Sequence, residues 1–154
     1  MSKPLYVARV SAVACASNGA KTMIQVVTPS TVGLRVKEVG FSFDGTDATK
    51  TPVLVELLLQ TTAGTSSALT LVKGGGQGAR TALCSALQTF TAEPTASDVL
   101  LSEYVSPAGG FDRIQWPLDD EPELVVSTRL GLRVTTVTGS GTPNFTGYIR
   151  FEEV

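Results

Sequence analysis

Apolar residues recur at every second position in several short segments of this chain, and Gly, Pro, Asn, Asp and Ser gather between them. A period of two is typical of β-strands that bury one face. The clearest segments are 33–44, 52–61, 129–137 and 144–153. Weaker patterns predict further strands at 5–14, 21–28, 67–73, 84–91, 98–105, 111–116 and 123–127. The pattern as a whole predicts about nine to eleven short strands.

Segment 52–61 is apolar on both faces. One face holds Val53, Val55, Leu57 and Leu59. The opposite face holds Leu54, Glu56, Leu58 and Gln60. We therefore expect this strand to lie in the centre of a sheet, covered on both sides.

Segment 33–44 alternates in two phases. Leu34 and Val36 share one face, and the inward set then continues with Val39, Phe41 and Phe43. The change of phase falls at Lys37-Glu38. Because one extra residue there would restore the inward set, we predict a β-bulge at this point.

The last two strong segments alternate without interruption. In segment 129–137, we expect inward-facing residues at Leu130, Leu132 and Val134. The outward-facing residues are then Arg129, Arg133 and Thr135. In segment 144–153, we expect inward-facing residues at Phe145, Ile149 and Phe151. The outward-facing residues are then Tyr148, Arg150 and Glu152. The turn residues at 138–143 predict a hairpin loop between them.

Helix signals are poor throughout. The best candidate, 79–88, has no capping box and is rich in Thr and Ala, so at most one or two turns are expected there. Strands without alternating helices favour an antiparallel arrangement over a parallel one. We predict one all-β domain over 1–154, an antiparallel β-sandwich of jelly-roll type with little or no helix.

Charge and hydropathy exclude some classes of partner. Charged residues make up only 17% of the chain, with a net charge of -2, so nucleic acid is not an expected partner. No run of about 18 apolar residues predicts a membrane span. The segment Met1 to Pro4 leads directly into strand-like sequence without a signal core, so we expect synthesis in a cytoplasm.

The residue types that carry most catalysis are scarce. The chain has no His, which removes the commonest general base and metal ligand. Cys15 and Cys84 match no metal-ligand spacing, so buried thiols are favoured over a disulfide or a nucleophile. The Gly-rich stretch 74–81 lacks the Lys-Ser/Thr ending of a phosphate loop and is interpreted as a surface loop. We expect no cofactor and no enzymatic activity.

Acidic residues cluster at Asp119, Asp120, Glu121 and Glu123. Their oxygens would suit calcium, but the spacing fits no EF-hand loop and Pro122 stiffens the run, so a solvated turn is favoured over a metal site. Trp116 lies beside Pro117 at a strand end. Its side chain has two possible roles, packing in the core or anchoring a partner or a sugar. A glycosidase site made of two carboxylates remains an alternative, because the two residues of such a pair can be far apart in the sequence and come together only in the folded protein.

Four segments carry a resemblance to a known class of proteins. They are Tyr-Val-Ser-Pro-Ala-Gly-Gly-Phe at 104–111, Ile-Gln-Trp-Pro-Leu at 114–118, Arg-Leu-Gly-Leu-Arg-Val at 129–134 and Gly-Tyr-Ile-Arg-Phe-Glu-Glu at 147–153. In these segments the chain resembles small structural proteins of tailed bacteriophages, especially those of phages that infect actinobacteria. The resemblance implies a jelly-roll-like virion protein on the capsid surface, commonly a homotrimer that cements the major capsid protein.

The sequence and the resemblance together suggest three hypotheses for the function of this chain. The first is a capsid decoration protein that stabilises the head. The second is a tail or head-fibre component that binds a carbohydrate or receptor through Trp116, Tyr104 and Tyr148. The third is a calcium-dependent or hydrolytic enzyme, which ranks last. Residues expected at a partner-binding surface are Trp116, Tyr104, Tyr148, Arg129 and Arg133.

Overall fold

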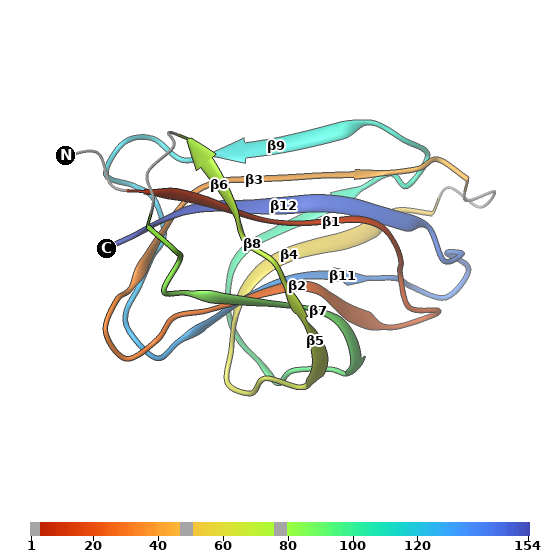
Figure 1. The fold of residues 1–154 in the computed structure, drawn as a ribbon. Helices are drawn as coiled ribbons and strands as arrows, with labels where there is room; N and C mark the ends of the chain where they lie inside the picture. Colours follow the sequence, from red (N-terminus) through yellow and green to blue (C-terminus); the bar gives the residue numbers. More distant parts are fainter. Residues whose placement is uncertain (1–3, 47–50, 76–79) are drawn as a thin grey trace.

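Two antiparallel sheets stacked face to face form the structure, a computed structural model that describes residues 4–46, 51–75 and 80–154 (Figure 1). The strands are β1 (Leu5–Ala14), β2 (Ala20–Val27), β3 (Leu34–Phe43), β4 (Val53–Gln60), β5 (Thr65–Leu69), β6 (Val72–Gly75), β7 (Ser85–Ala92), β8 (Ala96–Val105), β9 (Phe111–Gln115), β10 (Glu123–Leu124), β11 (Arg129–Thr135) and β12 (Asn144–Glu153). The predicted all-β sandwich is confirmed.

The upper sheet in Figure 1, sheet A, has the order β10-β3-β12-β1-β6, with β9 also paired to β3. The lower sheet, sheet B, has the order β5-β7-β2-β11-β4-β8. None of the described segments forms a helix that could span a membrane.

The strand pairing is nested in the manner of a jelly roll. Going inward from the two ends of the chain, β1 pairs with β12 and β2 pairs with β11. The series continues with β3 paired to β9 and β4 paired to β8. Successive pairs fall in alternate sheets, so a long folded-back ribbon is rolled into two layers.

Residues 61–95 are inserted between the two innermost strands of that ribbon, β4 and β8. The insertion adds β7 and β5 beside β2, and β6 beside β1. These strands lie together at the front of Figure 1. The insertion therefore covers the β1 and β2 edges of the roll, whereas β8 ends sheet B on the other side.

The core lies between the sheets and consists of the predicted inward residues. Leu130, Leu132 and Val134 of β11 are completely buried, as are Phe145, Ile149 and Phe151 of β12. Phe145 stacks near Phe41 at 6.5 Å between ring centroids and meets Phe43 edge-on at 5.7 Å. Burying large side chains of this kind is the main stabilising contribution to a sandwich.

The predicted bulge and the central strand are both confirmed. β12 pairs Arg150 with Glu38 and Phe151 with Val36, which leaves Lys37 as the extra residue. β4 lies between β11 and β8, and six of its eight residues are buried. Both features could be predicted from the sequence because they depend only on the local alternation of apolar and polar residues.

Other predictions differ from the structure because they depend on which strands pair. The loop 138–143 is not a hairpin: β11 lies in sheet B between β2 and β4, and β12 lies in sheet A. Segment 67–73 spans parts of two strands, β5 and β6, in different sheets. The described residues form twelve strands, and 80–88 contains no helix. In that last segment Cys84 and Ala86 are both buried with a period of two, which favours a strand.

A chain of hydrogen bonds crosses the outer face of sheet B. Gln25 donates to the Gln60 carbonyl at 2.7 Å, Gln60 donates to the Thr22 hydroxyl at 2.8 Å, and Thr22 donates to the Glu93 carboxylate at 2.8 Å. The first three residues are buried. Such a chain ending on a carboxylate strengthens each of its members. The amide of Gln60 lies over Gly131, where a Cβ would come within 2.5 Å of it.

Replacing Gly131 with Ala should destabilise the protein, because the new methyl group must displace the buried, hydrogen-bonded Gln60. We expect Gly131→Ala to lower the free energy of unfolding by about 2 kcal/mol. Gly19→Ala is the matched control, since the nearest atom to its Cβ lies at 3.9 Å. Urea unfolding followed by tryptophan fluorescence measures both. Equal stability of the two variants would contradict this explanation of Gly131.

Candidate binding surface

The outer face of sheet A carries side chains in rows that cross its strands. One row runs Arg9, Tyr148, Gly40 and Arg113 over β1, β12, β3 and β9. The neighbouring row on one side contains Thr146, Ser42 and Phe111. The row on the other side contains Arg150, Glu38 and Gln115. We call this set of residues the sheet A surface.

Tyr148 lies flat on the sheet A surface. A Cβ at Gly40 would come within 2.4 Å of its ring carbon Cε1 and 2.6 Å of its hydroxyl oxygen. The ring therefore covers Gly40, and only glycine leaves room for it there. The Tyr148 hydroxyl donates a hydrogen bond to Glu38 in the next row. The ring is half-buried, so part of it stays accessible from outside.

Glu38 anchors this arrangement. Burial alone would raise its pKa, but hydrogen bonds from Tyr148 and Gln115, helped by the nearby charges of Arg113 and Arg150, outweigh burial and hold the pKa below its ordinary value. Burial, followed by the hydrogen bond to Glu38, raises the pKa of Tyr148 to about 12. Near neutral pH the ionised Glu38 carboxylate thus accepts a hydrogen bond from the protonated Tyr148 hydroxyl, and this charge-assisted hydrogen bond fixes the orientation of the ring.

A hollow of about 250 Å³ opens beside Tyr148. It is lined by Arg9, Val10, Ser11, Ser42, Phe111, Thr146, Gly147 and Tyr148. Its residues thus come from four strands of sheet A, namely β1, β12, β3 and β9. It combines two aromatic rings, the aliphatic hydroxyl groups of three Ser and Thr residues and a guanidinium, which is the mixture of apolar and polar groups expected in a small-ligand site.

Ion pairs extend along β3 away from the hollow. Glu123 accepts from Arg35 at 2.7 Å, and Glu121 accepts from Lys37 at 2.9 Å. Two members of the predicted acidic cluster are therefore paired with cations of β3. Among the described residues, no group of three or more His, Cys, Asp or Glu side chains is arranged to hold a metal ion.

The aromatic residues predicted to share a site lie apart. Trp116 follows β9, and its partly buried side chain packs against the core. Tyr104 of β8 is 69% exposed and is the cross-strand partner of Leu54 in β4, on the outer face of sheet B. Tyr148 lies on the outer face of sheet A. These three residues therefore cannot form one stacking platform.

The two predicted arginines lie on sheet B, on either side of Gly131. Arg133 donates two hydrogen bonds to Glu56, at 2.8 and 3.0 Å. Arg129 is partly buried, and its Nε has no hydrogen-bond partner among the described residues. Arg129 and Arg133 therefore share the outer face of sheet B and do not meet Tyr148.

Strand β8 forms a second exposed feature. Among the described strands it pairs only with β4, and two register shifts interrupt that pairing. Val99 and Leu100 are 49% and 40% exposed. An edge strand with exposed apolar side chains is a place where another chain can add.

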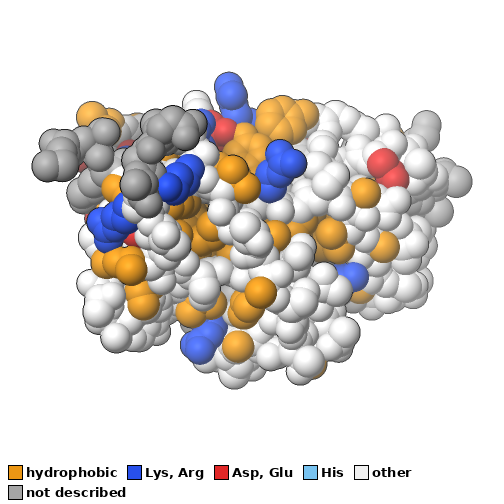
Figure 2. Space-filling model, in the orientation of Figure 1, with side chains coloured by type: hydrophobic (Ala, Val, Ile, Leu, Met, Phe, Trp, Pro, Cys, Tyr) orange, Lys and Arg blue, Asp and Glu red, His pale blue; other side chains and the backbone are white. Residues whose placement is uncertain are grey.

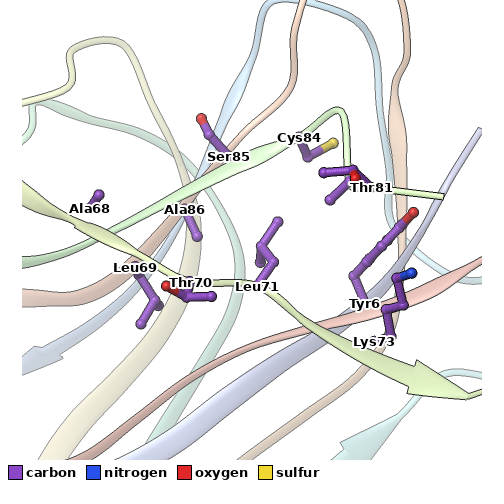
Figure 3. Close-up of a pocket in the computed structure, with 11 residues that line it drawn as sticks. Tyr6, Ala68, Leu69, Thr70, Leu71, Lys73, Thr81, Cys84, Ser85 and Ala86 are labelled. Carbon is purple, nitrogen blue, oxygen red and sulfur yellow. The ribbon is translucent and has the colours of Figure 1, made fainter. Parts of the chain in front are cut away.

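A hollow of about 350 Å³ opens between the sheets at the insertion (Figure 3). Tyr6, Lys73 and Thr81 lie at one end of it, and Ala68 and Leu69 lie at the other. Figure 2 shows apolar side chains gathered in the middle of this face, along the space between the layers. Thr81, the last residue of the Gly-rich stretch 74–81, lines this hollow, and 76–79 lie outside the described residues.

The cysteines are buried thiols, as predicted. Burial, followed by the charge of Glu153, raises the pKa of Cys84 to about 12, so this thiol stays protonated and is a poor nucleophile. Glu153 itself points inward and accepts hydrogen bonds from the backbone amides of Leu83, at 2.5 Å, and Cys84, at 2.7 Å. Its role is to hold the start of β7 against β12.

Of the sheet A surface, only Tyr148 is among the residues predicted to bind a partner, and Phe111 and Glu38 are two that were not predicted. Phe111 begins the predicted strand 111–116 and has no predicted binding role, but it is 60% exposed. Alternation with the core-packed Ile114 would have placed Phe111 outward. Glu38 had no such signal, because its partner Tyr148 is 110 residues away in the chain.

Comparisons with protein-family models, curated proteins and solved structures find no match for this chain. A fold alone does not specify a function. The chemistry of its surfaces is therefore what bears on its function.

Removing the Tyr148 hydroxyl should destabilise the protein in a pH-dependent way. We expect Tyr148→Phe to lower the free energy of unfolding by about 2 kcal/mol near neutral pH, since Glu38 loses a charge-assisted hydrogen bond. Because the folded-state pKa of Glu38 is lowered, its contribution is complete above the unfolded value of about 4.3 and is lost as pH falls through the folded value.

The measurement is urea unfolding of both proteins over a series of pH values. The difference between wild type and Tyr148→Phe should shrink in acid. Tyr104→Phe is the control and should match wild type at every pH, because Tyr104 is exposed and makes no hydrogen bond through its hydroxyl among the described residues. A Tyr148→Phe deficit that stays constant down to acid pH would contradict the role of Glu38.

Proposed function

We propose that this chain is a capsid decoration protein of a tailed bacteriophage, which binds the major capsid protein as a homotrimer and has no enzymatic activity. The observation that carries the proposal is the exposed edge strand β8, with Val99 and Leu100 accessible beside an unpaired strand edge. Association with other protein surfaces would bury those side chains and protect the edge. The site of action would be the outer capsid surface, after synthesis in the host cytoplasm.

Three of the four segments that carry the phage resemblance bear on the proposal in different ways. Segment 104–111 runs from the end of β8 to the start of β9, at the exposed side of the sandwich. Segments 129–134 and 147–153 lie in β11 and β12, where they supply core residues and the buried Glu153. Segment 104–111 is therefore where a docking surface is most expected, whereas segments 129–134 and 147–153 serve the fold.

The nested strand order gives further support by analogy. Jelly rolls recur in viral capsid proteins and in lectins, although the same fold serves unrelated functions. A trimer on a capsid would act by avidity, because several weak contacts engage together once the first has formed. No bond is made or broken in this mechanism; the shell is stabilised by contacts added across neighbouring subunits.

The principal test is assembly. We expect light scattering of the purified chain, or imaging of the particle, to give a trimer, and purified virions to carry the chain in numbers comparable to the capsid lattice. A handful of copies per virion would instead favour the alternative, a tail or head-fibre component. A chain that stays monomeric and fails to bind capsids would contradict the proposal.

Single substitutions test whether β8 forms the contact with other subunits or with the capsid. Val99→Lys places a charge on β8 and should abolish trimer formation or capsid binding. Val72→Lys is the matched control, since Val72 is 50% exposed, as Val99 nearly is, but lies on β6, which pairs with β1 in the other sheet. Far-ultraviolet circular dichroism verifies that both variants fold. Wild-type assembly by Val99→Lys would show that β8 is not the contact.

A further inference from the structure

We propose that the sheet A surface binds a saccharide, with one sugar ring seated in the hollow between Tyr148 and Phe111. The inference does not depend on a capsid location, because it rests on the geometry of β1, β12, β3 and β9 alone. It also places the sugar away from Trp116 and Tyr104, which lie elsewhere in the fold.

Small residues make the floor of the hollow. Thr146 and Ser42 are cross-strand partners, and Phe111 pairs with Ser42 on the far side. Gly40, under the Tyr148 ring, contributes no side chain. The surface is therefore low in the middle and bounded by larger side chains, which include Tyr148 and Phe111.

The two aromatic rings supply the apolar contact. One face of a pyranose ring presents C–H groups, which pack well on an aromatic ring with little loss of polar hydration. The Tyr148 ring is held flat by Gly40 below it and by its hydrogen bond to Glu38. Phe111 is 60% exposed at the side of the same hollow. A platform fixed before binding loses little entropy when the ligand arrives.

Polar groups around the hollow match the edge of a sugar. Ser11 and Ser42 line it, and neither side chain has a hydrogen-bond partner among the described residues. The Thr146 oxygen accepts the amide of Ala12 at 3.0 Å, which leaves its proton to be donated. Arg9 is exposed at the hollow and has no carboxylate partner in the described part of the chain, so it can bind sugar hydroxyls or a uronic acid carboxylate.

The size of the hollow favours a single ring over a larger ligand. Its volume of about 250 Å³ is below the range of roughly 300–1,000 Å³ that holds drug-sized molecules. The mixture of hydroxyl groups and rings also differs from an apolar protein-docking patch, where polar groups are depleted at the centre. A shallow, mixed surface of this kind suits a sugar within a longer polysaccharide.

The test is a nuclear magnetic resonance titration of the whole folded chain with two probes, a neutral β-1,4-glucose oligomer and an oligogalacturonide. Each is added to about 10 mM, which detects millimolar dissociation constants. We expect saturable shifts confined to residues around Arg9, Ser42, Phe111 and Tyr148 with at least one probe. If the oligogalacturonide binds, Arg9→Gln should weaken it. No saturable shift with either probe would overturn the proposal.

Matched variants separate stacking from non-specific binding. Phe111→Ala should weaken binding roughly tenfold through loss of one aromatic contact. Tyr104→Ala removes an equally accessible aromatic residue on the other sheet and should leave the affinity unchanged. Wild-type affinity in Phe111→Ala, or equal loss in Tyr104→Ala, would contradict the site. Neither result bears on the copy number per virion, so the decoration proposal is tested separately.

Discussion

The packing of two sheet faces against each other is the interaction on which the rest of this structure depends. Leu132 of β11 and Ile149 of β12 are completely buried in that layer although their strands belong to different sheets. Each strand contributes alternate residues to the same layer, and the opposite residues are left for other roles. Removal of apolar surface from water supplies most of the stability, which permits polar and aromatic groups on the outside.

The two outer faces use this freedom differently. On sheet B, Gln60 lies across Gly131 within a chain of buried hydrogen bonds. On sheet A, Tyr148 lies across Gly40 and is held by Glu38. In both cases a glycine allows a larger side chain from the next strand to lie flat. The sheet B arrangement is closed to solvent, whereas the sheet A arrangement borders an accessible hollow.

Features that depend on local alternation could be predicted from the sequence, and features that depend on distant partners could not. The bulge at Lys37, the burial of both faces of β4 and the outward position of Tyr148 all follow from a period of two. The assignment of β11 and β12 to different sheets does not, because the turn residues at 138–143 fit a hairpin equally well. Trp116 was open between two roles, and its packing against the core was settled by strands far away in the chain.

Amide hydrogen exchange in β8 tests the central claim, that the jelly roll leaves this edge open for assembly. The measurement compares the dilute chain with the same chain mixed with phage capsids, its proposed partner. The account predicts that amides of β8 directed away from β4 exchange rapidly in the dilute chain and become protected on the particle, while β4 is protected in both states. Slow exchange of those amides in the dilute chain, or rapid exchange in both states, would contradict it.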